Sequence, residues 1–182
     1  DNTKEIRNQI SLMKKLSNLN VKMFGSCWGM QLYSVANDGA VSKNSKGREI
    51  GIAYNIALNN KGQCHEMYKG KPTIFDAFAS HVDHVTTLPK GSVVLSDNYY
   101  SIQSLVTKYF WGTQYHPEFN FKYTGQILNA RKKILLNEGC FTKNQIEQLI
   151  KDFKKPNKNS YSQSIHSNQL RKTELSNWLK TI

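Results

Sequence analysis

The first forty residues alternate between helical and strand-like patterns of apolar positions. Residues 2–19 predict a helix because apolar side chains recur three or four positions apart, and residues 1–3 offer capping side chains. The recurring apolar positions are Ile6, Ile10, Met13 and Leu16. A short apolar run at 21–26 predicts a buried strand, and helical spacing resumes at Trp28 and stops near Asn37. This helix–strand–helix order is typical of an α/β fold with a parallel sheet.

The middle of the chain is rich in predicted strands. Residues 50–59 predict a half-buried strand because apolar side chains alternate at Ile52, Tyr54, Ile56 and Leu58 before the turn signal NNKG. Shorter apolar runs predict three further strands, with the turn signals PKG and DN between them. These runs are 92–96, 101–106 and 109–116.

The last third of the chain returns to helical patterns. Helical spacing predicts a helix over 121–137, and Thr142 with Gln145 indicates a capping box for a helix that reaches Phe153. The polar stretch KKPNKNSYSQS is typical of a linker, and residues 170–182 predict a last amphipathic helix. We therefore expect a main domain over 1–125 and a C-terminal helical extension over 126–182.

Composition narrows the class of protein without naming a function. The chain has 182 residues and a formal net charge of +12, and no run of about 18 apolar residues that would span a membrane. Its lysines are spread out and lack the aromatic interleaving of RNA-binding sheets, so nucleic acid is an unexpected partner. Three cysteines without metal-type spacing favour a reducing, cytoplasmic compartment.

The stretch FGSCWGMQ places Cys27 where the predicted strand meets the predicted helix. Gly25 and Gly29 flank the cysteine and permit the sharp turn of a nucleophile elbow. The dipole of the following helix would lower the pKa of the thiol, and the Trp28 N–H would donate to an oxyanion. Taken alone, the motif fits a buried structural cysteine equally well.

A thiolate nucleophile needs a base, and His116 and Glu118 in GTQYHPEF are the best pair available. Residues i and i+2 of an extended segment project on the same side, so the carboxylate can accept from the imidazole and orient it. The alternative is a histidine that only packs at a strand end.

A G-x-C-x-G-x-Q elbow followed some distance later by H-P-E resembles the class I glutamine amidotransferases. The resemblance implies a flavodoxin-like three-layer α/β sandwich with a mostly parallel central sheet. It implies that Cys27, His116 and Glu118 form the catalytic triad and that Trp28 and Gln31 contact glutamine. It extends through 47–62, 75–89 and 110–119, and these stretches resemble the free-standing members that are similar to the glutaminase domain of GMP synthase.

The loop SHVDHV is similar to a family segment whose backbone touches the amino-acid end of the substrate. The resemblance makes Ser80, His81 and Asp83 candidates for the substrate pocket, although Val82 stands where glycine is common. We interpret His84 as loop scaffolding. The family uses neither metal nor cofactor, and we expect none here.

Family members ordinarily begin with a strand, a helix and a second strand, followed by a glycine-rich loop that supplies a second oxyanion donor. None of these precedes Asp1, so we expect an N-terminally truncated fragment that is prone to aggregation. Loss of one oxyanion donor costs about a hundred- to thousand-fold in turnover.

The resemblance implies hydrolysis of the glutamine side-chain amide, with ammonia passed to an acceptor. The C-terminal extension is too short for a synthetase domain, so a synthetase partner would be a separate chain. Two alternatives stay open: a γ-glutamyl hydrolase or peptidase on the same scaffold, and a non-enzymatic binding module of the same fold.

Overall fold

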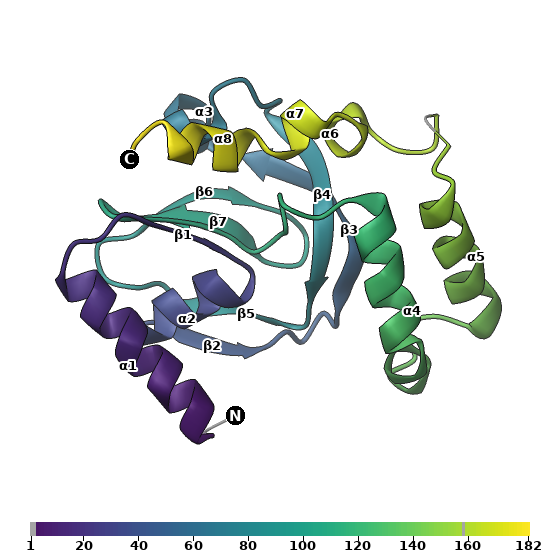
Figure 1. Cartoon of the computed structure of the whole chain (residues 1–182), viewed down its shortest axis with the longest axis horizontal. Helices are drawn as coiled ribbons and strands as arrows, with labels where there is room; N and C mark the ends of the chain where they lie inside the picture. Colours follow the sequence, from purple (N-terminus) through teal and green to yellow (C-terminus); the bar gives the residue numbers. More distant parts are fainter. Residues whose placement is uncertain (1–2, 158) are drawn as a thin grey trace.

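The computed structural model describes residues 3–157 and 159–182, and Figure 1 shows a sheet flanked by helices. The helices are α1 (Lys4–Asn18), α2 (Trp28–Ala36), α3 (Asn60–Cys64), a 3₁₀ turn η1 (Glu66–Tyr68), α4 (Phe121–Asn137), α5 (Lys143–Lys154), α6 (Gln163–His166), α7 (Asn168–Arg171) and α8 (Thr173–Leu179). The strands are β1 (Met23–Ser26), β2 (Ala40–Lys43), β3 (Glu49–Leu58), β4 (Ile74–His81), β5 (Asp83–Thr87), β6 (Val93–Asp97), β7 (Ile102–Val106) and β8 (Phe110–Thr113).

Six strands form one sheet in the order β1-β8-β7-β6-β3-β4, and β2 pairs with β5 in a separate two-stranded sheet. The pair β1–β8 is parallel, whereas β8–β7, β7–β6, β6–β3 and β3–β4 are antiparallel. The sheet of the described residues is therefore mixed, and the expectation of mostly parallel strands does not hold for these pairs. For two of these pairs, β6–β7 and β7–β8, the reason is loop length: the connections 98–101 and 107–109 are too short for the crossover that a parallel neighbour requires.

The main sheet separates two apolar layers, as expected for a three-layer sandwich. On one face, Met30 and Tyr33 of α2 pack with Leu105 and Phe110. On the other face, Val106 and Leu95 pack with Met67 and Tyr68 of η1. Leu105 and Val106 are consecutive in β7 and point to opposite faces, as the period of two requires.

A third apolar cluster joins the C-terminal helices to the outer strands of the sheet. Leu128 of α4 and Ile146 and Phe153 of α5 are buried against Ile52 of β3 and Phe78 of β4. Figure 1 shows α4 beside β3 and α5 on the outer side of α4, while α6 to α8 run back across the molecule. The predicted boundary between 125 and 126 falls inside α4. The division into two domains stays a prediction.

Several predicted elements are confirmed, and two differ in detail. The helix over 121–137, the strand before Cys27 and the Thr142 capping box are present. In β3 the alternation breaks, because a bulge lies between Ala53 and Ile56 and leaves Tyr54 exposed. The last predicted helix is divided at Lys172 into α7 and α8. The N-cap of α1 is Thr3, and the candidate caps Asp1 and Asn2 lie outside the described residues.

No helix in the described ranges is long and apolar enough to cross a membrane.

Candidate active site

Cys27 occupies a strained turn between β1 and α2. Its backbone angles are φ 46° and ψ −100°, a left-handed conformation that is costly for any residue other than glycine. The Cys27 N–H donates to the Thr113 carbonyl at 2.7 Å, and the Cys27 carbonyl accepts the first N–H of the helix from Gln31 at 3.1 Å. Backbone hydrogen bonds to β8 and to α2 therefore hold the strained residue in place, as in a nucleophile elbow.

The two glycines that flank the elbow differ in their surroundings. A Cβ atom at Gly25 would lie 2.8 Å from the Gly29 backbone carbon and 2.8 Å from the Phe110 ring, so only glycine fits. A Cβ atom at Gly29 would meet nothing within 4 Å. Contacts within the chain therefore require glycine at position 25, as predicted, whereas a side chain at Gly29 would meet only open space.

His116 and Glu118 lie beside the elbow because β8 runs parallel to β1, with Ser26 opposite Thr113. The His116 Nδ1 is 2.6 Å from Glu118 Oε1, and the Ser26 hydroxyl donates to the same oxygen at 2.9 Å. The segment is not extended as expected: β8 ends at Thr113, residues 114–115 form a bend, and residues 117–118 form a turn. The expected pair is formed, and its Nδ1 contact leaves Nε2 as the ring nitrogen that can exchange a proton with a substrate.

The pKa of the Cys27 thiol is raised, whereas a position at a helix N-terminus was expected to lower it. Burial raises the pKa of the Cys27 thiol to about 11, and the hydrogen bond from the Trp28 N–H offsets this only in part. Desolvation also acts on Glu118, but the His116 ring and the Ser26 hydroxyl hold the pKa of this carboxyl below its ordinary value. The thiol is therefore protonated at neutral pH and needs a base, and Glu118 is ionised and can orient that base.

A chain of side-chain amides connects the nucleophile to the loop after β4. The Gln114 Nε2 contacts Cys27 Sγ at 3.6 Å, and the Gln31 Nε2 donates to Gln114 Oε1 at 3.3 Å and to the Asp83 carbonyl at 2.8 Å. Gln31 is buried, so its amide group is engaged within the chain. No hydrogen bond joins Cys27 Sγ to His116 among the described residues, although both line one cavity.

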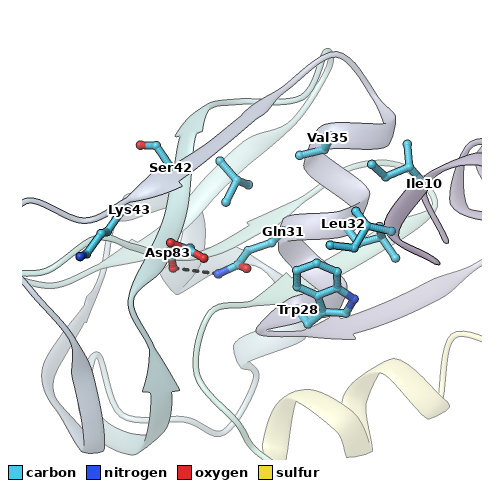
Figure 2. Close-up of a pocket in the computed structure, with 10 residues that line it drawn as sticks. Ile10, Trp28, Gln31, Leu32, Val35, Ser42, Lys43 and Asp83 are labelled. Carbon is cyan, nitrogen blue, oxygen red and sulfur yellow. Dashed lines mark hydrogen bonds between the residues drawn. The ribbon is translucent and has the colours of Figure 1, made fainter. Parts of the chain in front are cut away.

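Trp28 lines two cavities. Its ring is half exposed and donates through Nε1 to Gln9 Oε1 at 2.8 Å. The first, of about 420 Å³, is shown in Figure 2 and lies between α1, α2, β2 and the start of β5. Gln31 and Asp83 face one another across its floor in this view. The second, of about 370 Å³, is lined by Cys27, Ser80, His116 and one face of α4.

The structure separates the three predicted residues of the SHVDHV loop. Ser80 lines the second cavity and Asp83 lines the first, but His81 is buried and lines neither. The His81 Nε2 is 2.9 Å from Glu49 Oε2, and its Nδ1 is 3.2 Å from the Asp83 carbonyl. Glu49 also accepts from two amide side chains, those of Gln103 and Asn98. His81 is thus placed to hold the loop rather than to touch a substrate.

No group of three or more histidine, cysteine or acidic side chains that could hold a metal occurs among residues 3–157 and 159–182.

Sequence reasoning missed three residues of this site. Ser26 and Gln114 are adjacent to motif positions but carry no pattern of their own, and their roles depend on the pairing of β1 with β8. Arg131 lies in a helix that the sequence predicts, but no motif marks it as a site residue. Its spacing from Tyr123 and Ile127 (i, i+4, i+8) was a usable signal, because it places all three on one helical face.

Comparison with known proteins identifies the class. The family described as "Glutamine amidotransferase class-I" matches residues 1–134, so the chain belongs to the class I glutamine amidotransferase family. The solved structure of a glutamine amidotransferase from Thermotoga maritima superposes with a TM-score of 0.73 at 18% identity, covering 97% of this chain and 68% of that one. This likeness confirms the α/β fold class.

Two kinds of curated relative point to related reactions. A γ-glutamyl-L-1-hydroxyisopropylamide hydrolase from Pseudomonas sp. is 34% identical over 189 residues, covering 94% of this chain and 64% of the relative. The GMP synthase [glutamine-hydrolyzing] of Neisseria meningitidis is 30% identical over 116 residues, covering 62% of this chain and 22% of the relative. The chain therefore spans less than two thirds of the length of these relatives. At a coarse level, the family and these relatives support an enzyme.

Proposed function

We propose that this protein hydrolyses the γ-amide bond of glutamine or of a γ-glutamyl amine through Cys27, His116 and Glu118. The observation that supports this most strongly is the left-handed Cys27 at the start of α2, in one cavity with His116, whose Nδ1 is held by Glu118 at 2.6 Å. A structural cysteine would have no need of the strained backbone.

In the proposed first step, His116 Nε2 removes the thiol proton while Cys27 Sγ bonds to the amide carbon. The carbonyl oxygen becomes an oxyanion that the Trp28 N–H stabilises. The carbon–nitrogen bond then breaks, and His116 gives its proton to the departing ammonia or amine. Glu118 keeps the imidazole in one tautomer and stabilises its charged form throughout.

In the second step, water attacks the γ-glutamyl thioester while His116 Nε2 takes a proton from that water. The carbon–sulfur bond breaks, the sulfur recovers the proton from His116, and glutamate leaves. The elevated pKa of the Cys27 thiol supports proton transfer during attack rather than a stored thiolate.

The first cavity is suited to the amino-acid end of the substrate. It is lined by one carboxylate, Asp83, and one ammonium group, Lys43, which match the α-ammonium and α-carboxylate of a glutamyl group. Figure 2 shows both on the side of the cavity opposite Leu32. Gln31 and Trp28 lie between this end and the nucleophile.

The Pseudomonas relative favours release of an amine into water, whereas the GMP synthase relatives favour delivery of ammonia to an acceptor. In the second case the ammonia would pass to a synthetase that aminates the acceptor. A cytoplasmic location suits both reactions, because a reducing compartment keeps Cys27 as a free thiol.

The test is glutamate release from glutamine and from γ-glutamyl-isoamylamide, combined with intact-mass detection of the acid-quenched thioester. Cys27→Ala should abolish both signals, while Cys64→Ala, which removes an exposed free thiol outside both cavities, should keep them. Detection of the thioester on Cys27 adds a readout that does not depend on complete turnover.

Equal glutamate release by the wild type and Cys27→Ala would refute the triad. A chain that forms no thioester with either substrate would instead favour the non-enzymatic binding module of the same fold.

A further inference from the structure

The cavity between His116 and α4 is much larger than the ammonia that leaves when glutamine is hydrolysed. Its volume is about 370 Å³, whereas ammonia is similar in size to water, which occupies about 30 Å³ in the liquid. The excess volume is continuous with Cys27 and His116, since both line the same cavity.

The position of His116 defines which part of a substrate faces this cavity. In the proposed reaction His116 protonates the leaving nitrogen, so any substituent on that nitrogen must extend on the His116 side of Cys27. The glutamyl part then extends past Trp28 toward Gln31 and Asp83 in the first cavity.

The wall of the second cavity is mostly carbon. The Phe119 ring stacks on His116 at 3.8 Å between centroids, and Tyr123 packs edge-on against Phe119 at 4.8 Å. Ile127 and Ala130 continue this wall along α4. These side chains favour an amine that carries an apolar group.

Arg131 stands at the end of this wall and is the only permanently charged side chain among the described lining residues. Its Nη1 donates to the neutral Ser80 hydroxyl at 3.3 Å, and within the described chain it forms no ion pair. By contrast, Arg48 is held by Glu138 through two bonds of 2.7 and 2.8 Å. The Arg131 guanidinium therefore keeps donors for an added carboxylate.

We propose that the cavity beneath α4 is a leaving-group subsite in which Arg131 binds a carboxylate, so that the preferred substrates are γ-glutamyl amino acids with apolar side chains. This inference rests on the proposed hydrolysis at Cys27 and names its substrate class. Arg131 acts as a specificity residue, and Ser80 positions its guanidinium.

The experiment compares γ-glutamyl-leucine with γ-glutamyl-isoamylamide, which has the same carbon skeleton without the carboxylate. In the wild type, kcat/KM for γ-glutamyl-leucine should exceed that for γ-glutamyl-isoamylamide by roughly two- to five-fold, because an ion pair with the exposed Arg131 is lost. Arg131→Met should bring this ratio close to one, and Arg131→Lys should keep part of it. Lys133→Met, which removes an exposed charge two residues along α4, is the matched control and should leave the ratio unchanged.

Each outcome separates this inference from the proposed function. A wild-type ratio near one, or a ratio that Arg131→Met does not change, overturns the subsite while Cys27-dependent cleavage stands. An equal loss for both compounds in Arg131→Met also overturns it, because Arg131 would then bind the glutamyl part or stabilise α4. Failure of every γ-glutamyl compound and of glutamine to acylate Cys27 would instead remove the proposed function.

Discussion

Glu174 of α8 and Lys71 form an ion pair that is almost completely closed to solvent. The Lys71 Nζ is 2.8 Å from Glu174 Oε1, and the two side chains are 1% and 0% exposed. The same oxygen accepts the Tyr115 hydroxyl at 2.5 Å, and Lys71 also donates to the Leu170 carbonyl at 2.8 Å. Glu174 thus connects α8 both to Lys71 and to Tyr115, the residue that precedes His116.

Removing the charge on Glu174 leaves a buried ammonium group without a counter-charge. Loss of one partner of a buried ion pair costs about 3–5 kcal/mol of unfolding free energy. For a chain of this size, that corresponds to a fall of about 6–20 °C in the midpoint of thermal unfolding. We expect this loss for Glu174→Gln and a similar one for Lys71→Met.

The assay is thermal and urea unfolding of the full chain, followed by circular dichroism, for both single variants and for Lys71→Met/Glu174→Leu. The double variant should recover much of the loss, because it removes both charges and fills the site with carbon. Lys132→Met, which breaks an exposed pair with Glu147, is the control and should change the midpoint little. Single variants as stable as the wild type, or a double variant that shows the summed loss, would refute the reasoning.

Three further predictions follow from local geometry. Iodoacetamide should alkylate Cys27 at a rate that still rises between pH 8 and about pH 10, because burial raises the pKa of the thiol and the thiolate is the reactive form. The rate is followed on the Cys27 peptide by mass spectrometry, and a plateau below pH 8 would contradict this. Gly25→Ala should destabilise the fold measurably in urea, whereas Gly29→Ala should not, because only the first introduces a Cβ into occupied space; equal midpoints would show that the elbow adjusts. Thr142→Ala should lower the unfolding free energy by about 0.5–2 kcal/mol because it removes the capping box of α5, and an unchanged urea midpoint would count against that role.

Much of the local structure was predictable because helices, caps and elbows depend on neighbours along the chain. Apolar spacing placed α1, α2 and α4, and the pair Thr142 and Gln145 indicated the start of α5. The glycine–cysteine–glycine spacing predicted the turn at Cys27, whose positive φ agrees with it. His116 and Glu118 are two residues apart, so their contact needed no knowledge of the fold.

The rest of the site depends on contacts between residues that are far apart in the sequence. Ser26 reaches Glu118 across 92 positions, Arg131 reaches Ser80 across 51, and the buried His81 meets Glu49 across 32. Such pairs depend on strand order and register, and a single sequence carries no periodic signal for either.

The sequence by itself thus determined the candidate reactive groups and the elements that carry them, because backbone geometry and residue spacing act locally. The tertiary structure decided the rest: the mixed strand directions, the buried role of His81, and the cavity beneath α4 with Arg131 at its end. The physical reason is that a cavity or an ion pair exists only where separate elements pack together, and packing is a property of the whole chain.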